Sequence, residues 1–188
     1  MGTRNLTVVA KNGEYKIAQY GQWDGYPDGA GISILKFLKK NNLKNLSEKI
    51  DEVKFLSKNE IDAINEEIKE KQKSDAAFRW TDYWPHLSRD CGWQILEYVS
   101  HHGIKEVINK LQFAGDSLFC EWAYVIDLDE NTFEVYKGFN EVPLSVEDRF
   151  YFLQENESKY YPVKLIKKYD LNNLPDEKKF LTDFSSEE

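Results

Sequence analysis

The chain has 188 residues, of which 41% are hydrophobic and 14% are aromatic, and its formal net charge is −8. This size and composition are typical of one domain that can bury a substantial core. The acidic balance argues against nucleic acid as a partner, because phosphate binding needs a basic surface. A small anionic ligand is still compatible, since a local pocket can be positive on an acidic protein.

The sequence contains neither a secretory signal segment nor a run of apolar residues long enough to cross a membrane. We therefore expect a cytoplasmic protein with no membrane partner, whose two cysteines, Cys91 and Cys120, are reduced thiols. A single globular domain is predicted over residues 1–184, followed by a short acidic tail at 185–188. A homo-oligomer is left open.

The chain begins with a predicted β-hairpin. Leu6–Ala10 is an apolar run typical of a buried strand, and Tyr15–Tyr20 is the return strand. Between them, Asn12-Gly13 is the strongest short signal for a two-residue hairpin turn. After an intervening loop, three apolar residues recur at helical spacing, which predicts a helix over residues 31–41 that ends at its two asparagines.

The loop between this hairpin and this helix, Gln19–Gly31, is unusually rich in glycine and aromatic residues. It leads into a helix N-terminus, where backbone N–H groups favour an anion. Its glycines permit tight turns or close approach of another group, and its aromatic rings offer stacking faces. We predict that it forms one wall of a polar ligand site, with six candidate ligand-binding residues: Gln19, Tyr20, Gln22, Trp23, Asp24 and Tyr26.

A purely structural interpretation of the same loop is equally open. Asp24-Gly25 and Asp28-Gly29 are also typical turn sequences that shape a loop. For Trp23 and Tyr26, core or loop packing is favoured over a stacking platform, since aromatic side chains carry much of the buried area in proteins.

The middle of the chain predicts helices. Ser57–Glu60 is a capping box, which predicts a helix over residues 58–72. Ser88 is a candidate cap for another helix, with Asp90 in its first turn and Gly103 at its end. Apolar residues at helical spacing over 104–111 predict a further short helix.

The last third predicts a second hairpin, formed by Leu118–Asp127 and Thr132–Tyr136. A helix near residues 146–154 and a strand over 161–169 follow. The predicted fold class is therefore α+β, with an antiparallel sheet of about five strands built from the two hairpins and the C-terminal strand, and with helices packed on it.

Four further residues are candidates for supplying positive charge to a bound anion: Arg4, Arg79, His86 and Arg89. Arginine forks onto phosphate and carboxylate groups, although pairing with an acidic side chain explains these residues equally simply. We predict no cofactor and no metal, because His101-His102 lacks further ligands at a suitable spacing. No catalytic residue is assigned, since no Walker loop and no nucleophile elbow is present.

Met1–Thr7 (MGTRNLT) and Gln19–Pro27 (QYGQWDGYP) resemble a family of uncharacterised proteins encoded by bacteriophages, some bacteria and some fungi. The family has no settled activity, so the resemblance brings no catalytic residue with it. It implies a phage origin, and thus a location in the host cytosol. Small phage proteins often act on the host, sometimes by sequestering nucleotide-derived immune signals.

A second, weaker resemblance is to the N-terminal nucleophile hydrolases, whose mature chains begin with Thr, Ser or Cys on a strand that turns back as a hairpin. Removal of Met1 and Gly2 would expose Thr3 with its own amine as base. The sequence therefore leaves two functions open. The first is sequestration of a small, anionic, nucleotide-like ligand without catalysis. The alternative is a hydrolase, acting through Thr3 or as a phosphoesterase through Asp24, His86 and Asp90.

Overall fold

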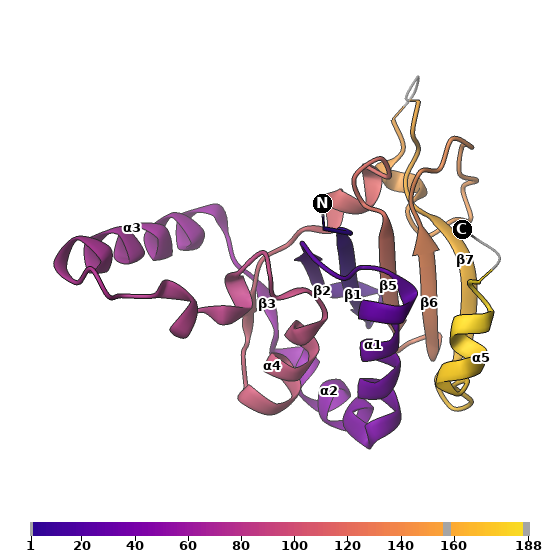
Figure 1. Cartoon of the computed structure of the whole chain (residues 1–188), viewed down its shortest axis with the longest axis horizontal. Coiled ribbons are helices and arrows are strands. Elements are labelled where there is room, and N and C mark those ends of the chain that lie inside the picture. The colour runs from indigo at the N-terminus through magenta and orange to yellow at the C-terminus, as the bar shows by residue number, and fades with distance from the viewer. Residues whose placement is uncertain (1, 156–158, 186–188) are drawn as a thin grey trace.

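The computed structural model describes residues 2–155 and 159–185. Its centre is a five-stranded sheet with the order β2-β1-β5-β6-β7 (Figure 1). The strands of this sheet have the following bounds: β1 Asn5–Lys11, β2 Glu14–Gly21, β5 Trp122–Asp127, β6 Thr132–Lys137 and β7 Lys164–Asp170. Two short strands, β3 (Lys54–Phe55) and β4 (Glu106–Val107), pair with each other separately.

The predicted α+β class is confirmed, with both hairpins and the C-terminal strand in one sheet. The sheet is antiparallel except at its centre, where β1 and β5 run parallel and Thr7 lies opposite Tyr124. The two hairpins are tied together at their turns, because the Asp129 carboxylate accepts bonds of 2.8 Å from the backbone N–H groups of Asn12 and Gly13. Asn12 and Gly13 both have positive φ, as a two-residue hairpin turn requires.

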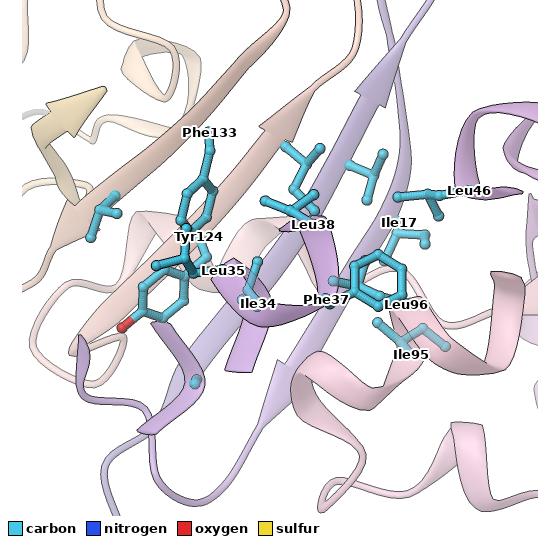
Figure 2. Packing of buried hydrophobic residues seen from close by; sticks show 14 of the residues in the cluster. Ile17, Ile34, Leu35, Phe37, Leu38, Leu46, Ile95, Leu96, Tyr124 and Phe133 are labelled. Atoms are coloured by element: carbon cyan, nitrogen blue, oxygen red, sulfur yellow. The ribbon is translucent and has the colours of Figure 1, made fainter. Parts of the chain in front are cut away.

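Helices cover one face of the sheet, and α3 extends away from it (Figure 1). Within the described residues, the α-helices have these bounds: α1 Ile32–Phe37, α2 Leu43–Lys49, α3 Lys58–Ser74, α4 Ile95–His102 and α5 Glu177–Thr182. Figure 2 shows Ile34, Leu35 and Phe37 of α1 packed over the sheet. Side chains of α1, α2 and α4 share one buried cluster with Tyr124 and Phe133 of the sheet.

Two local signals for helix ends are confirmed. The capping box of α3 is present, since the Glu60 N–H donates to Ser57 Oγ and the Glu60 carboxylate accepts from the Ser57 N–H. Gly103 ends α4 in the left-handed conformation, at φ 69°.

Four helix predictions are wrong. The chain stays helical through Asn41 and Asn42 into α2, because burial of Leu46 and Ile50 further along outweighs the local stop signal. Ser88 does not cap α4, and instead its hydroxyl accepts the Asp90 N–H in a turn. Residues 104–111 contain β4 rather than a helix, and residues 146–154 contain only a 3₁₀ turn at Tyr151–Leu153.

The opposite face of the sheet has its own smaller apolar cluster, which includes Leu6, Val8 and Tyr136. Beside it lies a buried ion network, in which Arg149 binds both Asp127 and Glu134. The acidic tail predicted at 185–188 lies outside the described residues, apart from Ser185. None of the described helices is long and apolar enough to cross a membrane.

Candidate functional site

A pocket of about 490 Å³ opens at the end of β1 and β2. Its walls are Asn5 on β1, residues from the loop and helix start at 21–33, and residues from the turn at 90–94. We call it the loop–turn pocket. It lies at the junction where the sequence predicted a ligand site, between the first hairpin and the first helix.

The two walls of this pocket are joined by direct hydrogen bonds. The indole Nε1 of Trp23 donates to Asp90 Oδ1 at 2.8 Å. The backbone N–H of Gln22 donates to the carbonyl of Arg89 at 3.0 Å. The turn at Ser88–Asp90 is itself held by the bond from the Asp90 N–H to Ser88 Oγ. These contacts place an aromatic ring and a carboxylate from distant parts of the sequence side by side.

The loop is also anchored to the sheet beneath it. The buried hydroxyl of Tyr124 donates to the carbonyl of Gly25 at 2.8 Å, and the Gly25 N–H donates to the carbonyl of Thr3 at 3.0 Å. Burial raises the pKa of the Tyr124 phenol well above its usual range, so the hydroxyl keeps the proton that it donates. The loop is therefore held in one shape from below.

Asp24 has a backbone conformation that few residues other than glycine adopt, with φ at 52°. Its carbonyl accepts the Ala30 N–H at 2.7 Å, which folds the loop back onto itself. A Cβ atom on Gly29 would lie 2.3 Å from that carbonyl oxygen, so only glycine fits there. This local geometry places Asp24 in the lining of the pocket.

Hydrogen-bond acceptors and aromatic rings dominate the lining of the pocket. Asp24, Asp28 and Asp90 provide three carboxylates, and Trp23 and Tyr26 are both about half exposed. Among the described residues that line the pocket, none is Lys, Arg or His. Such a lining favours a ligand that donates hydrogen bonds, and it disfavours an anionic group inside the pocket.

The structure brings three of the predicted binding residues together, since Trp23, Asp24 and Tyr26 all line the loop–turn pocket. Gln19 and Gln22 are not part of the lining. Gln19 is buried and its amide nitrogen faces the carbonyls of Tyr20 and Ser88. Gln22 accepts the Tyr20 hydroxyl at 2.7 Å.

Arg4 and Tyr20 lie on the opposite face of the sheet, because successive side chains of a strand point to opposite faces. The Arg4 guanidinium stacks 4.5 Å from the centre of the Phe119 ring. Tyr20 packs edge-on against Phe113, a neighbour of the second apolar cluster. The expectation that Arg4 shares the pocket with Trp23 is therefore not met in this structure, since Arg4 is not part of the lining.

The remaining predicted cations lie outside the pocket. Arg79 is exposed on the segment after α3. Arg89 is also exposed, but its Nε lies 3.7 Å from Asp90 Oδ1, at the border of the pocket. His86 lines a different pocket with residues of β3 and β4, and burial lowers its pKa. The grouping of Asp24, His86 and Asp90 expected for a phosphoesterase is therefore not assembled here.

Some residues of the lining were not predicted as site residues from the sequence: Asn5, Asp28, Ser33, Trp93 and Gln94. Asp28 stands within the glycine-rich segment and was interpreted only as turn chemistry. Asn5 carries a usable signal, because a polar residue at an inward position of a buried strand needs a partner. Trp93 and Gln94 carry no local signal, since tertiary contacts bring their turn to the loop.

Other chemistry is limited in the described part of the chain. Burial raises the pKa of the Cys91 thiol to about 12 and that of Cys120 well above its usual value, so neither is an activated nucleophile. No group of three or more His, Cys, Asp or Glu within residues 2–155 and 159–185 is placed to hold a metal ion. Comparisons with protein-family models, curated proteins and solved structures find no match.

Proposed function

We propose that the protein binds a small nucleotide-derived ligand in the loop–turn pocket and holds it without chemical change. One observation carries this proposal: two half-exposed aromatic rings, Trp23 and Tyr26, stand beside the carboxylates of Asp24 and Asp90. A nucleobase has a flat face for stacking and an edge with N–H donors. This pairing of ring and carboxylate supports a base as the buried part of the ligand.

The energetics of stacking favour this arrangement. Base–aromatic stacking contributes about 1–3 kcal/mol per base. Trp23 is fixed in place by its bond to Asp90, so less side-chain entropy is lost when a ring stacks on it. The phosphate part of the ligand would lie outside the pocket, away from the carboxylates of its lining. Arg89 is exposed there, at the border of the pocket. The predicted anionic ligand is thus retained in the proposal, with its charge outside the pocket.

The absence of a nucleophile–base pair in the described lining supports binding over catalysis. Hydrolysis needs a nucleophile or activated water, a base and an oxyanion stabiliser in one place. The hydroxyl of Ser33 donates to the carbonyl of Gly29 at 2.9 Å, which is a structural bond of α1. No hydrogen bond joins that hydroxyl to Asp24, Asp28 or Asp90 in the described lining, so none of these carboxylates is placed as its base.

The alternative hydrolase through Thr3 needs the removal of Met1 and Gly2. Thr3 is buried next to the loop, and its carbonyl holds Gly25. Gly2 lies tightly against the indole of Trp23, where a Cβ atom would be 2.2 Å from Cε3. Cleavage before Thr3 would therefore change the surroundings of Trp23. Mass spectrometry of the active protein decides between these functions, since an intact N-terminus excludes Thr3 as nucleophile.

The phage origin, the host-cytosol location and the role in sequestering an immune signal stay predictions that rest on the family resemblance. If they hold, the ligand that the protein binds is a signal molecule of the host. Ligand capture itself is testable without them.

A nucleotide panel tests the proposed binding directly. A bound ligand raises the thermal midpoint by mass action, so midpoints are measured with each nucleoside and nucleotide in excess. We expect at least one of them to raise the midpoint, and Tyr26→Ala to abolish the rise. Tyr83→Ala is the matched control, because Tyr83 is also exposed but lies on the segment after α3. No rise with any member of the panel contradicts the proposal.

A further inference from the structure

We infer that the loop–turn pocket selects guanine over the other bases, and that the side chain of Asn5 takes part in this selection. This inference rests on the proposed function and names the base that the same site takes. It starts from the chemistry of the walls, which present acceptors from two directions. Asp24 and Asp28 come from the loop, and Asp90 comes from the turn.

An ionised carboxylate only accepts hydrogen bonds, and its two oxygens accept a pair of parallel donors. Guanine has such a pair on one edge, formed by the ring N1–H and the adjacent exocyclic amino group. Adenine and cytosine each place one amino group beside a ring nitrogen that is itself an acceptor. Uracil has one ring N–H between two carbonyls. An acceptor facing a carboxylate leaves both lone pairs without a hydrogen, which costs affinity.

Asn5 supplies an independent observation that points to the same kind of ligand. It is 1% exposed and lines the pocket. Its Nδ2 donates to the carbonyl of Trp23 at 3.1 Å and to that of Gly21 at 3.5 Å. These two carbonyls fix the orientation of the amide, because they accept only from its nitrogen. The other end, Oδ1, is a buried acceptor with no partner among the described residues.

Glycines keep the surroundings of this oxygen free of side chains. A Cβ atom on Gly21 would lie 2.7 Å from Asn5 Oδ1, and one on Gly92 would lie 4.0 Å from it. Both glycines also line the pocket. Gly92 has φ at 49°, which other residues rarely adopt. Gly21 and Gly92 pack closely beside this oxygen, since a Cβ atom on Gly21 would lie 3.0 Å from Gly92 Cα. A ligand donor that reaches Oδ1 from the pocket satisfies an acceptor that the protein leaves unpaired, so a donor-rich base is favoured again.

Four nucleosides without phosphate separate base selection from anion binding. Affinities for guanosine, inosine, adenosine and cytidine are measured by calorimetry under one buffer condition. Inosine is the sharpest comparison, because it differs from guanosine only in lacking the exocyclic amino group. We expect guanosine to bind about tenfold or more tightly than inosine, the cost of one lost bond to a charged acceptor. Adenosine and cytidine should bind more weakly than guanosine.

Two substitutions identify the acceptors. Asp24→Asn and Asp28→Asn each exchange one carboxylate oxygen for a donor, and at least one of them should reduce the preference for guanosine over inosine to about twofold or less. Asp62→Asn on α3 is the control, since Asp62 is an exposed acid away from the pocket. For Asn5, whose replacement would disturb the fold, the side-chain amide resonances are followed instead. They should shift with guanosine, and unmoved resonances contradict contact at Oδ1.

The outcomes separate the two proposals. If adenosine or cytidine binds as tightly as guanosine, guanine selection is overturned while ligand capture stands. If equal affinities for guanosine and inosine are found, recognition of the amino group is overturned. If no nucleoside or nucleotide binds at millimolar concentration, the proposed function itself fails.

Discussion

The indole Nε1 of Trp23 donates to Asp90 Oδ1 at 2.8 Å, across 67 positions of sequence. This contact joins the loop after the first hairpin to the turn before α4, and the two segments form facing walls of the loop–turn pocket. It leaves Trp23 about half exposed while the edge of the indole is held by Asp90. The stacking surface is therefore fixed in position before a ligand arrives, which reduces the entropy lost on binding.

Trp23→Phe should weaken ligand binding with little loss of stability. The variant keeps an aromatic ring but removes the donor, so the ring is no longer held by Asp90. Because the bond is exposed, we expect the free energy of unfolding to fall by no more than about 1 kcal/mol. Calorimetry and urea denaturation measure the two effects. A wild-type affinity in Trp23→Phe would show that the bond to Asp90 is not needed for binding.

Tyr124→Phe should lower both stability and affinity. The hydroxyl of Tyr124 is the donor to the buried carbonyl of Gly25, and its loss leaves that carbonyl unsatisfied. We expect a loss of about 1–3 kcal/mol in the free energy of unfolding. Tyr83→Phe, on an exposed tyrosine, is the control and should change neither quantity. Unchanged unfolding of Tyr124→Phe in urea would rule out this anchor as a source of stability.

Local signals in the sequence predicted much of the fold. Asn12-Gly13 and the capping box at Ser57 act through neighbouring residues, so they are visible without tertiary information. The parallel pairing of β1 with β5 is not local, and nothing in either hairpin specifies it. The helix through Asn41 and Asn42 was missed for the same reason, since packing further along decides it.

The residues of the candidate site were likewise predicted only in part from the sequence. Trp23 and Tyr26 stand in one dense segment, and the sequence alone placed them at a site. Trp93 reaches the pocket only through tertiary contacts. Arg4 was grouped with them because an anionic ligand needs positive charge, although Arg4 lies just before β1 and stacks on Phe119 instead of lining the pocket.

Ser57→Ala should lower stability without changing ligand binding. The hydroxyl of Ser57 accepts the Glu60 N–H at 3.3 Å and begins α3, which extends away from the sheet and contributes no residue to the described lining of the pocket. Loss of such a cap costs about 1 kcal/mol. Thermal unfolding and nucleoside affinity are measured on the same preparation. A changed affinity at full stability would contradict the separation of α3 from the site.

Stability should fall in acid partly through Glu134. Burial raises the pKa of this carboxyl, but hydrogen bonds from Arg149 and Tyr136 outweigh burial and lower the pKa to about 2. Because the pKa of Glu134 is lower in the folded protein than in the unfolded chain, the ionised carboxylate stabilises the fold at pH values above 4.5, the pKa of the unfolded chain. This stabilisation is lost as the pH falls from 4.5 toward 2. This change in the pKa of Glu134 corresponds to at most about 3 kcal/mol in the free energy of unfolding.

Urea denaturation at a series of pH values measures this contribution. Glu134→Gln cannot titrate, so its stability should fall less steeply between pH 4.5 and 2 than that of the unmodified protein. Glu97→Gln, which changes an exposed residue of α4, should keep the full slope. Equal slopes for the unmodified protein and Glu134→Gln would show that other groups control acid unfolding.

Recovery of the ligand after binding tests the central claim most directly. The protein is incubated with guanosine nucleotides, separated from free ligand and denatured by heat, and the released molecule and the intact protein are both weighed by mass spectrometry. We expect the released nucleotide to be chemically unchanged, in an amount that matches the occupied pockets. A new product that accumulates beyond the amount of protein, from chains that still carry Met1, would contradict this expectation.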